Sequence, residues 1–404
     1  MNKQALDGVK VLDFGSGIAG PISTRELANH GAQVVHIQTA TRTPAARLAA
    51  RSAMGEMMFG GIPADWYNNS KYSIALNLKH PRSRVVAEKL IRWADIVLEN
   101  YRPGAMDKLG LGYEQMKKIN PGIIYLSSSG HGQTGPYGQQ GGVDGIANAL
   151  SGRIFLAGWP DRGAVNPSDV PYADAVHPLF NAIAMMAALD YKRRTGKGQY
   201  LDVSMDETDT FSVVPPLLDW QANKHLQTRT GNRIPNASPH GVFPCIGDDR
   251  WCAITVFTNE EWSAFCHVID DPPWTKEPKF ASLSLRKKNE DELEELVGKW
   301  TQKHSAEDVM RLMQAAGVPA GVVQNAKDLL ESDPQLKARE WLVSLKNPEL
   351  GVFPHPTPPY KLSKTKAQVR TSPVLGEHTE YVCTKLLNIS KEEFAELNKE
   401  GVFT

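Results

Sequence analysis

Short apolar runs rich in β-branched residues alternate with helical stretches along the first half of the chain. The candidate strands lie at residues 9–14, 34–37, 73–78, 96–98, 123–126 and 200–203. The candidate helices between them lie at residues 23–30, 81–93 and 179–193. Strands that alternate with helices pair as parallel βαβ units. We therefore expect an α/β fold built on an open parallel sheet.

A chain of 404 residues is long for one compact core, so we expect two lobes. Residues 1–210 form the expected large domain, and residues 211–230 form a linker. Residues 231–325 combine a strand at 251–257 with three helical stretches, which predicts a smaller α+β domain. Residues 326–404 form an extended connection that is rich in proline (Pro348, Pro354, Pro356, Pro358 and Pro359), followed by a helix at 391–399 that returns to the large domain.

The charge balance gives no sign of a polyanion-binding surface. The 45 basic and 45 acidic residues are spread along the chain, so nucleic acid and membrane surfaces are poor candidates for partners. The first residues carry charges and lack the apolar stretch of a secretory signal, so we expect a cytoplasmic protein. Four cysteines (Cys245, Cys252, Cys266 and Cys383) match neither a zinc site nor a redox pair in their spacing, and we expect reduced, partly buried thiols.

A glycine-rich turn, GSGIAG at residues 15–20, follows the first candidate strand. Such a turn brings backbone N–H groups to the carboxyl edge of a sheet, where nucleotides usually bind. A nicotinamide cofactor is not favoured, because Pro21 follows at once and Gln38 offers no carboxylate to a ribose. A tight turn between strand and helix, without a ligand, remains the alternative.

Seven segments carry a more specific signal across nearly the whole chain. They are LDGVKVLD with AGP (6–13 and 19–21), KYSIALNLK (71–79), ENYRPGAMDKLGLG (99–112), SGHGQTGP (129–136), TGKGQYLDVS (195–204), AGVPAGVV (316–323) and GEHT (376–379). In order and spacing they resemble the family III CoA-transferases, which include formyl-CoA transferase, carnitine CoA-transferase and the α-methylacyl-CoA racemases. The resemblance implies a Rossmann-like large domain, a small domain and two interlocked chains, either a homodimer or a hetero-oligomer with a related chain.

The resemblance also implies the chemistry. In the family, an aspartate just before the helix that leads into the TGxGQ turn is the nucleophile, and Asp174 occupies that place here. A carboxylate can attack a thioester, form a mixed anhydride and then hold CoA as an aspartyl thioester, so coenzyme A and acyl-CoA enter as substrates and no tightly bound cofactor or metal is implied. The alternative role for Asp174 is an ordinary helix N-cap.

Several further positions correspond to the family's binding residues. For CoA these are Ser16, Gly17, Ile18, Ala19, Leu76, Lys79, Asn100, Tyr101, Ala105 and Lys108. The two lysines suit phosphate oxygens, although each taken alone is more often a solvated charge. Val143, Asp144, His240 and Gly241 correspond to positions around the acyl pocket.

A racemase is the runner-up function. That branch needs a second acid or base opposite the aspartate, supplied by the histidine of a Gly-His-Asp run. The corresponding run here is Gly142-Val143-Asp144, and valine carries no proton. His131 and His177 are candidate substitutes, though hydrogen-bonded or surface roles are more common for histidine. A non-catalytic subunit of a hetero-oligomer is a further alternative.

Some positions depart from the formyl-CoA transferase pattern. Thr39 stands in place of an arginine that binds CoA, and Ile18 in place of a glutamine near the nucleophile. The glycine loop over that enzyme's active site corresponds to residues 236–241, NASPHG, which predicts a different acid substrate. The methionine-rich segment 45–66 is a candidate wall for a larger acyl group, with ordinary core packing as the alternative.

Overall fold

The computed structural model describes residues 3–38, 64–166, 171–347 and 351–404. Thr39 and nearly all of the methionine-rich segment lie outside these ranges. The chain divides into two compact units. The first comprises residues 1–155, 166–227 and 337–404, and the second comprises residues 156–165 and 228–336.

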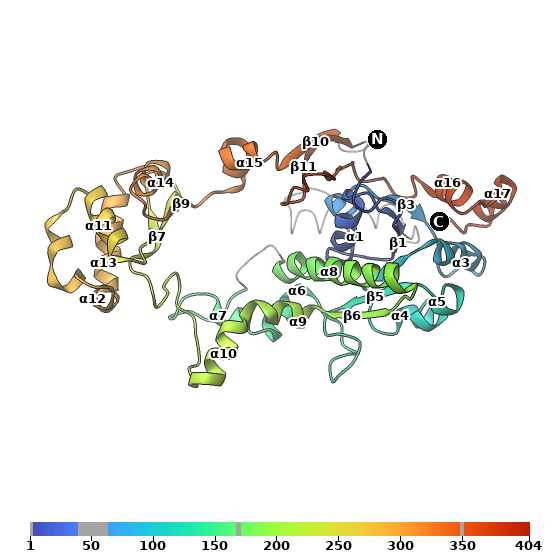
Figure 1. Ribbon diagram of the computed structural model, residues 1–404, viewed down its shortest axis with the longest axis horizontal. Helices are drawn as coiled ribbons and strands as arrows, with labels where there is room; N and C mark the ends of the chain where they lie inside the picture. The colour runs from blue at the N-terminus through green and yellow to red at the C-terminus, as the bar shows by residue number, and fades with distance from the viewer. Residues whose placement is uncertain (1–2, 39–63, 167–170, 348–350) are drawn as a thin grey trace. The chain divides into compact units, whose positions relative to one another are not determined.

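A six-stranded parallel sheet forms the centre of the first unit and confirms the predicted α/β fold (Figure 1). Its strands are β1 (Lys10–Asp13), β2 (Gln33–Gln38), β3 (Tyr72–Ala75), β4 (Ile96–Glu99), β5 (Ile124–Ser129) and β6 (Tyr200–Ser204). The strand order is β3-β2-β1-β4-β5-β6, which is the order of a doubly wound Rossmann sheet. The order reverses between β1 and β4, and such a switch point opens a crevice at the carboxyl ends of the strands.

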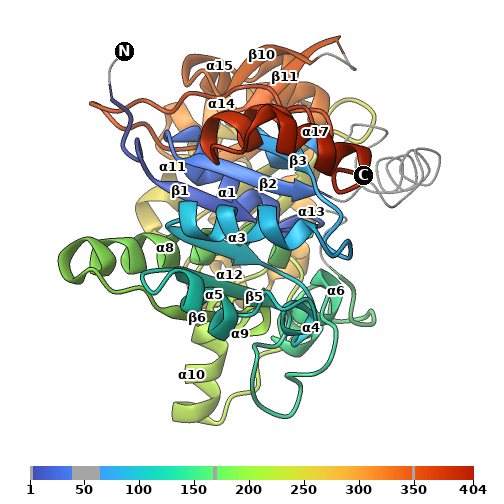
Figure 2. The ribbon, with the colours of Figure 1, turned by 90° about the vertical axis from the view of Figure 1, so that its right-hand side faces the viewer.

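Both faces of the central strands of this sheet are buried, which explains why these strands are mostly apolar, whereas the edge strand β6 leaves Tyr200 and Asp202 exposed. Neighbouring residues such as Val34 and Val35 point to opposite faces and join two separate cores. One core includes residues of α3 (Ser83–Trp93), α5 (Tyr113–Ile119) and α17 (Lys391–Lys399), which lie in front of the sheet in Figure 2. The other includes residues of α1 (Ala19–Asn29) and α8 (Tyr172–Thr195).

Two of these helices begin earlier than the sequence predicted. Helix α1 begins at Ala19, so Pro21 lies in its first turn, where a missing N–H costs no hydrogen bond. Helix α8 begins at Tyr172 and continues through Pro178. Among the described residues of this unit, the other α-helices are α4 (Ala105–Lys108), α6 (Asp144–Leu150), α9 (Met205–Thr210), α10 (Val214–Asn223) and α16 (Thr379–Tyr381), with α7 (Arg153–Leu156) at the boundary between the units.

The predicted extended connection through the prolines is wrong in part. Pro354 and Pro356 lie in β11 (Gly351–Pro356), which pairs antiparallel with β10 (Leu342–Asn347). Both strands of a two-stranded ribbon are edges, so a proline can be accommodated without loss of a ladder hydrogen bond. Pro358 and Pro359 follow the hairpin without regular structure, and Pro348 lies outside the described residues.

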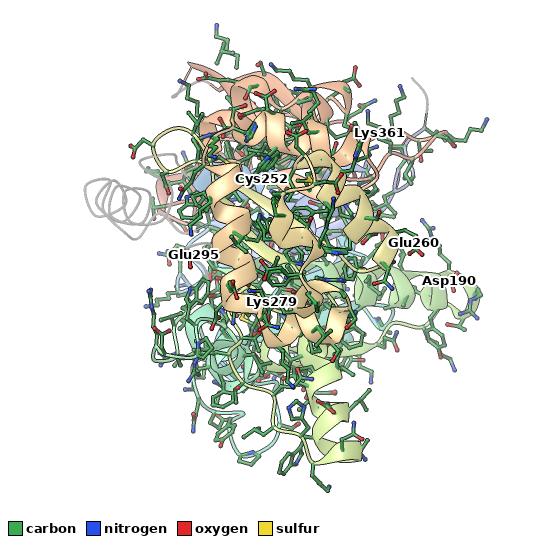
Figure 3. The ribbon with its side chains drawn as sticks, turned by 90° about the vertical axis from the view of Figure 1, so that its left-hand side faces the viewer. Asp190, Cys252, Glu260, Lys279, Glu295 and Lys361 are labelled. Atoms are coloured by element: carbon green, nitrogen blue, oxygen red, sulfur yellow. The ribbon has the colours of Figure 1, made fainter. Side chains whose placement is uncertain are left out.

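The second unit is a three-stranded antiparallel sheet packed with helices. Its strands are β7 (His240–Pro244), β8 (Trp251–Thr255) and β9 (Ala320–Val322). Its helices are α11 (Asn259–Val268), α12 (Leu283–Lys288), α13 (Glu290–Thr301) and α14 (Ala306–Ala315), with α15 (Pro334–Ala338) at the boundary. Glu260 and Glu295 are exposed, whereas Cys252 is buried in the core (Figure 3). All four cysteines are free, as predicted, but they are buried rather than partly buried. None of the helices in the described ranges has the length and apolar character to cross a lipid bilayer.

Candidate active site

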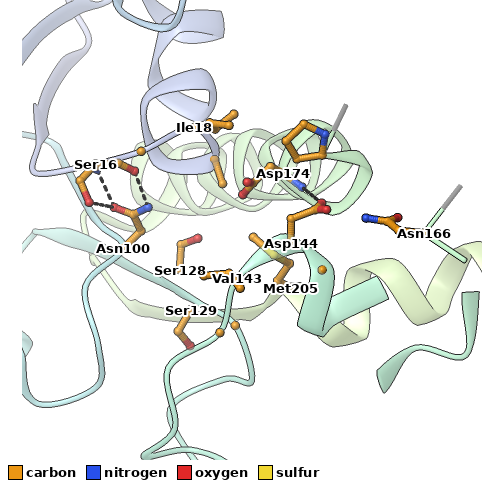
Figure 4. A pocket seen from close by; sticks show the side chains of 16 residues that line it. Ser16, Ile18, Asn100, Ser128, Ser129, Val143, Asp144, Asn166, Asp174 and Met205 are labelled. Carbon is orange, nitrogen blue, oxygen red and sulfur yellow. Dashed lines mark hydrogen bonds between the residues drawn. The ribbon is translucent and has the colours of Figure 1, made fainter. Parts of the chain in front are cut away.

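A cavity of about 770 Å³ lies at the carboxyl edge of the parallel sheet, at the switch point between β1 and β4 (Figure 4). Its walls come from the turn after β1, the end of β5, and the first turns of α6 and α8, all within the first unit. The lining includes Ser16, Gly17, Ile18, Ala19, Asn100, Val143, Asp144 and Asp174. The structure therefore brings eight of the sequence-predicted site residues to one cavity.

The buried ion pair of Asp13 and Lys71 stabilises the glycine-rich turn through hydrogen bonds. The Asp13 carboxylate accepts hydrogen bonds from the Gly15 N–H (2.7 Å), the Thr24 hydroxyl (2.7 Å) and Lys71 Nζ (2.9 Å). Lys71 Nζ also donates to the Pro21 carbonyl at 2.8 Å. Burial would raise the pKa of Asp13, but Lys71 and His36 outweigh burial and hold it well below its usual range. Burial lowers the pKa of Lys71 to about 8.

Close packing explains why this turn needs glycine. A Cβ on Gly15 would lie 2.7 Å from Asp13 Oδ1, and a Cβ on Gly20 would lie 2.8 Å from Asn100 Cγ. Asn100 holds the turn from the other side, because it accepts the Ser16 N–H at 2.7 Å and donates to the Ser16 carbonyl at 2.9 Å. These contacts on both sides hold the conformation of the turn, and its residues Gly17 to Ala19 line the cavity.

Asp174 is the third residue of α8, inside its first turn rather than before it, and it does not act as the N-cap. Its backbone N–H donates to Asp144 Oδ1 at 3.2 Å, so two carboxylates face the same cavity. Burial, together with the negative charge of Asp144, raises the pKa of Asp174 to about 6. Four residues later, Pro178 has no N–H to donate to the Asp174 carbonyl, so the regular helical hydrogen bond is missing at this residue.

The two candidate histidines occupy polar environments near the cavity. Burial lowers the pKa of His177 to about 4, and both of its ring nitrogens contact hydroxyls: Nε2 lies 2.7 Å from Ser128 Oγ and Nδ1 lies 3.0 Å from Thr208 Oγ1. His131 Nδ1 lies 2.5 Å from Asp206 Oδ2. Val143, at the position of the racemase histidine, is 66% exposed at the N-cap of α6.

Other predicted residues lie outside the lining of this cavity. The Leu76 side chain is fully buried in the core, whereas Lys79 and Lys108 are exposed. Tyr101 and Ala105 are half-buried and lie close to Asn100 in sequence, Ala105 at the start of α4. His240 and Gly241 belong to β7 in the second unit. Asp169, a nearby carboxylate, lies outside the described residues.

Sequence reasoning missed the remaining wall of the cavity. The missed lining residues are Ser128, Ser129, Gly130, Gly142, Gly145, Asn166, Pro171 and Met205. For Ser128, Ser129 and Gly130 at the end of β5, and Met205 after β6, the position along the chain was available as a signal, because ligands in open α/β sheets bind at the carboxyl ends of strands. Within the described ranges, no group of three or more His, Cys, Asp or Glu side chains is placed to hold a metal ion.

Comparison with known proteins identifies the family. The profile described as CoA-transferase family III matches residues 6–379. The chain is 31% identical to the succinyl-CoA–D-citramalate CoA-transferase of Chloroflexus aurantiacus over 98% of both chains. It is also 31% identical, over 98% of both chains, to the beta subunit of the succinyl-CoA–L-malate CoA-transferase of the same organism. A CAIB/BAIF family protein from Brucella suis has the same fold, with a TM-score of 0.85 and 28% identity over 96% of this chain and 100% of that chain.

The chain therefore belongs to CoA-transferase family III, an enzyme family whose substrates are CoA thioesters. This confirms the resemblance found in the sequence.

Proposed function

We propose that the protein moves coenzyme A from an acyl-CoA donor to a carboxylic acid acceptor through an aspartyl-CoA thioester on Asp174. The carboxylate attacks the thioester carbonyl, the C–S bond breaks, and a mixed anhydride and CoA thiolate form. The thiolate then attacks the Asp174 carbonyl of the anhydride and releases the donor acid. The acceptor carboxylate repeats the sequence in reverse, so Asp174 is regenerated and no proton is gained or lost.

The observation that carries this proposal is the position of Asp174 in the cavity at the sheet's switch point. With a pKa of about 6, its carboxyl is roughly nine-tenths ionised at pH 7 and is available as a nucleophile. Burial and the Asp144 charge both disfavour the carboxylate, so conversion to a neutral thioester relieves an unfavourable charge. The same burial limits access of water to the anhydride.

We propose that CoA lies along the carboxyl edge of the sheet, with its thioester end at the Ser16 to Ala19 turn and Asn100. Lys79 and Lys108 are exposed and suit the phosphate groups, with Tyr101 and Ala105 near the same path. Since the Leu76 side chain is enclosed in the core, any contact of this residue with CoA involves its backbone. Succinyl-CoA is the proposed donor, because both named relatives act on it.

Racemisation is less well supported by the site. It requires two groups that exchange protons with the α-carbon. His177 is buried, and its pKa of about 4 leaves it neutral and poorly basic at pH 7. His131 Nδ1 is hydrogen-bonded to the Asp206 carboxylate, and the Val143 side chain has no proton to exchange.

A kinetic experiment tests the proposal. The wild-type protein and Asp174→Asn are assayed with succinyl-CoA and a panel of carboxylic acids, and the products are separated by chromatography. A covalent aspartyl-CoA predicts ping-pong kinetics and loss of transfer in Asp174→Asn, because an amide cannot form the anhydride. Asp190→Asn, at the solvent-exposed end of α8, is the matched control. Undiminished transfer by Asp174→Asn, or uptake of solvent deuterium at the α-carbon without transfer, contradicts the proposal.

A further inference from the structure

A buried chain of hydrogen bonds passes along the floor of the cavity. Thr208, His177, Ser128, Asn181 and Ser23 are all buried and join α9, α8, β5 and α1. Ser128 is the member that lines the cavity, and its residue is only 2% exposed. None of these contacts is needed for the transfer chemistry on Asp174, so the chain calls for a separate explanation.

The number of protons that each group can donate determines which atom carries the proton in each of these hydrogen bonds. The Thr208 hydroxyl donates its one proton to the Met205 carbonyl at 2.9 Å, so it accepts from His177 Nδ1. A neutral imidazole with its proton on Nδ1 has an unprotonated Nε2, and Nε2 therefore accepts the Ser128 hydroxyl proton at 2.7 Å. At the other end, Ser23 donates to the Ala19 carbonyl at 2.7 Å.

The same count shows what Ser128 can offer to a ligand. Its proton is committed to His177, and one of its two lone pairs accepts from Asn181 Nδ2 at 3.2 Å. One lone pair remains, which makes Ser128 Oγ a hydrogen-bond acceptor toward the cavity. Figure 4 shows the Ser128 hydroxyl directed toward the side of the cavity where Asp174 lies.

An acceptor at this position selects among acyl groups. A hydroxyl on the acid would donate to Ser128, whereas a bare methylene leaves the buried oxygen without that partner. A carboxylate at the same place has no proton to donate, so its oxygens would be repelled by the Ser128 lone pair. The cavity also already holds the carboxylates of Asp144 and Asp174. The arrangement is therefore matched to a hydroxyl group.

We propose that Ser128 is a specificity-determining residue that accepts a hydrogen bond from a hydroxyl of the acid that accepts CoA, so that the substrate class is a hydroxy acid. His177 acts through Ser128 as a positioning residue, because it holds the serine proton away from the cavity. The inference rests on the proposed transfer function, since it concerns the acid that exchanges CoA with Asp174.

Matched pairs of acceptor acids test the assignment. Transfer from succinyl-CoA is measured to butyrate and 3-hydroxybutyrate, and to glutarate and 2-hydroxyglutarate, with both enantiomers of each hydroxy acid. The wild type is expected to favour at least one hydroxy acid over its unsubstituted partner by about tenfold in kcat/KM, the size of one good hydrogen bond. Ser128→Ala is expected to bring that ratio close to one, with transfer to the unsubstituted acid retained.

A second variant separates recognition from packing. His177→Phe frees the Ser128 proton, so the preference for hydroxy acids should fall even though Ser128 is intact. Ser73 is a buried serine on β3 that donates to Gln38 Oε1, accepts from the Gly376 N–H and does not line the cavity, so Ser73→Ala should leave the ratio unchanged. Circular dichroism checks that each variant is folded, and Ser128→Ala alone decides the matter if His177→Phe does not fold.

A wild-type ratio near one for both pairs, or the same ratio in Ser128→Ala as in wild type, overturns the inference while the transferase function stands. Absence of transfer to every acid, or transfer that Asp174→Asn does not reduce, overturns the proposed function itself.

Discussion

Asp174 and Asp144 are one hydrogen bond apart, and their charges are coupled. Because burial and the Asp144 charge raise the pKa of Asp174 to about 6, kcat/KM for acyl-CoA should fall as the pH drops below that value. Asp144→Asn removes one of the two causes, so the acid limb of the profile should move to lower pH. A pH series of initial rates measures this, with Asp190→Asn as a control. An acid limb that stays in place in Asp144→Asn contradicts the coupling.

The same raised pKa has a cost in stability. A carboxyl whose folded pKa exceeds its unfolded value of 3.8 destabilises the fold as pH rises from about 4 to about 6, and the loss is complete above that window. Asp174→Asn removes this charge, so the variant should be more stable than wild type by roughly 1–3 kcal/mol at about pH 8 and equally stable near pH 4. Denaturant unfolding at the two pH values measures the difference. If Asp174→Asn is less stable than wild type at both pH values, the charge of Asp174 does not destabilise the folded protein.

At the scale of single residues, the sequence predicted Asp174 and the glycine-rich turn but not the Ser128–His177 pair. Asp174 and the turn lie in motifs with a recognisable order along the chain. Ser128 and His177 are 49 positions apart, on a strand and a helix, and are joined only by tertiary packing. No periodicity or local motif relates two such residues, so the polar floor of the cavity emerges only when α8 is placed against β5.

Among the elements, the turn between β1 and α1 depends on the buried pair of Asp13 and Lys71. Lys71→Met leaves the Asp13 carboxylate buried without its cation, which should destabilise the protein by about 3–5 kcal/mol. It should also raise KM for acyl-CoA, because the Gly15 turn loses part of its support. Thermal unfolding and initial rates measure the two effects. The double variant Asp13→Asn/Lys71→Met should recover part of the stability, and a single variant as stable as wild type would refute the role of the pair.

The central strands of the parallel sheet were predictable because burial on both faces makes most of their residues apolar. The hairpin of β10 and β11 was not, because Pro354 and Pro356 argue against any central strand and only an edge position admits them. The start of α8 was misplaced for a related reason. The predicted helix began at residue 179, just after Pro178, yet the helix begins at Tyr172 and continues across this proline, so Asp174 lies in its first turn.

On the scale of the whole molecule, apolar side chains remain exposed on two helices of the first unit. Ile183 on α8 is 65% exposed, and Leu218 and Trp220 on α10 are 57% and 51% exposed. We propose that a second chain, identical or related, covers them.

Light scattering after size exclusion measures that association. The wild type should be a dimer, and Leu218→Glu combined with Trp220→Glu should shift it toward monomer by placing charge in an apolar interface. Val352→Glu, at another exposed apolar side chain on β11, is the matched control and should stay dimeric. A wild-type monomer at micromolar concentration would rule out the proposed assembly.

Chemical trapping determines whether Asp174 holds CoA covalently. The protein is mixed with succinyl-CoA, reduced with borohydride and digested, and the peptide that contains Asp174 is analysed by mass spectrometry. In the wild type we expect borohydride to reduce the aspartyl thioester to homoserine at position 174. Asp174→Asn should give no such product. An unmodified Asp174 in protein that is actively transferring CoA, or a thioester found on another residue, would contradict it.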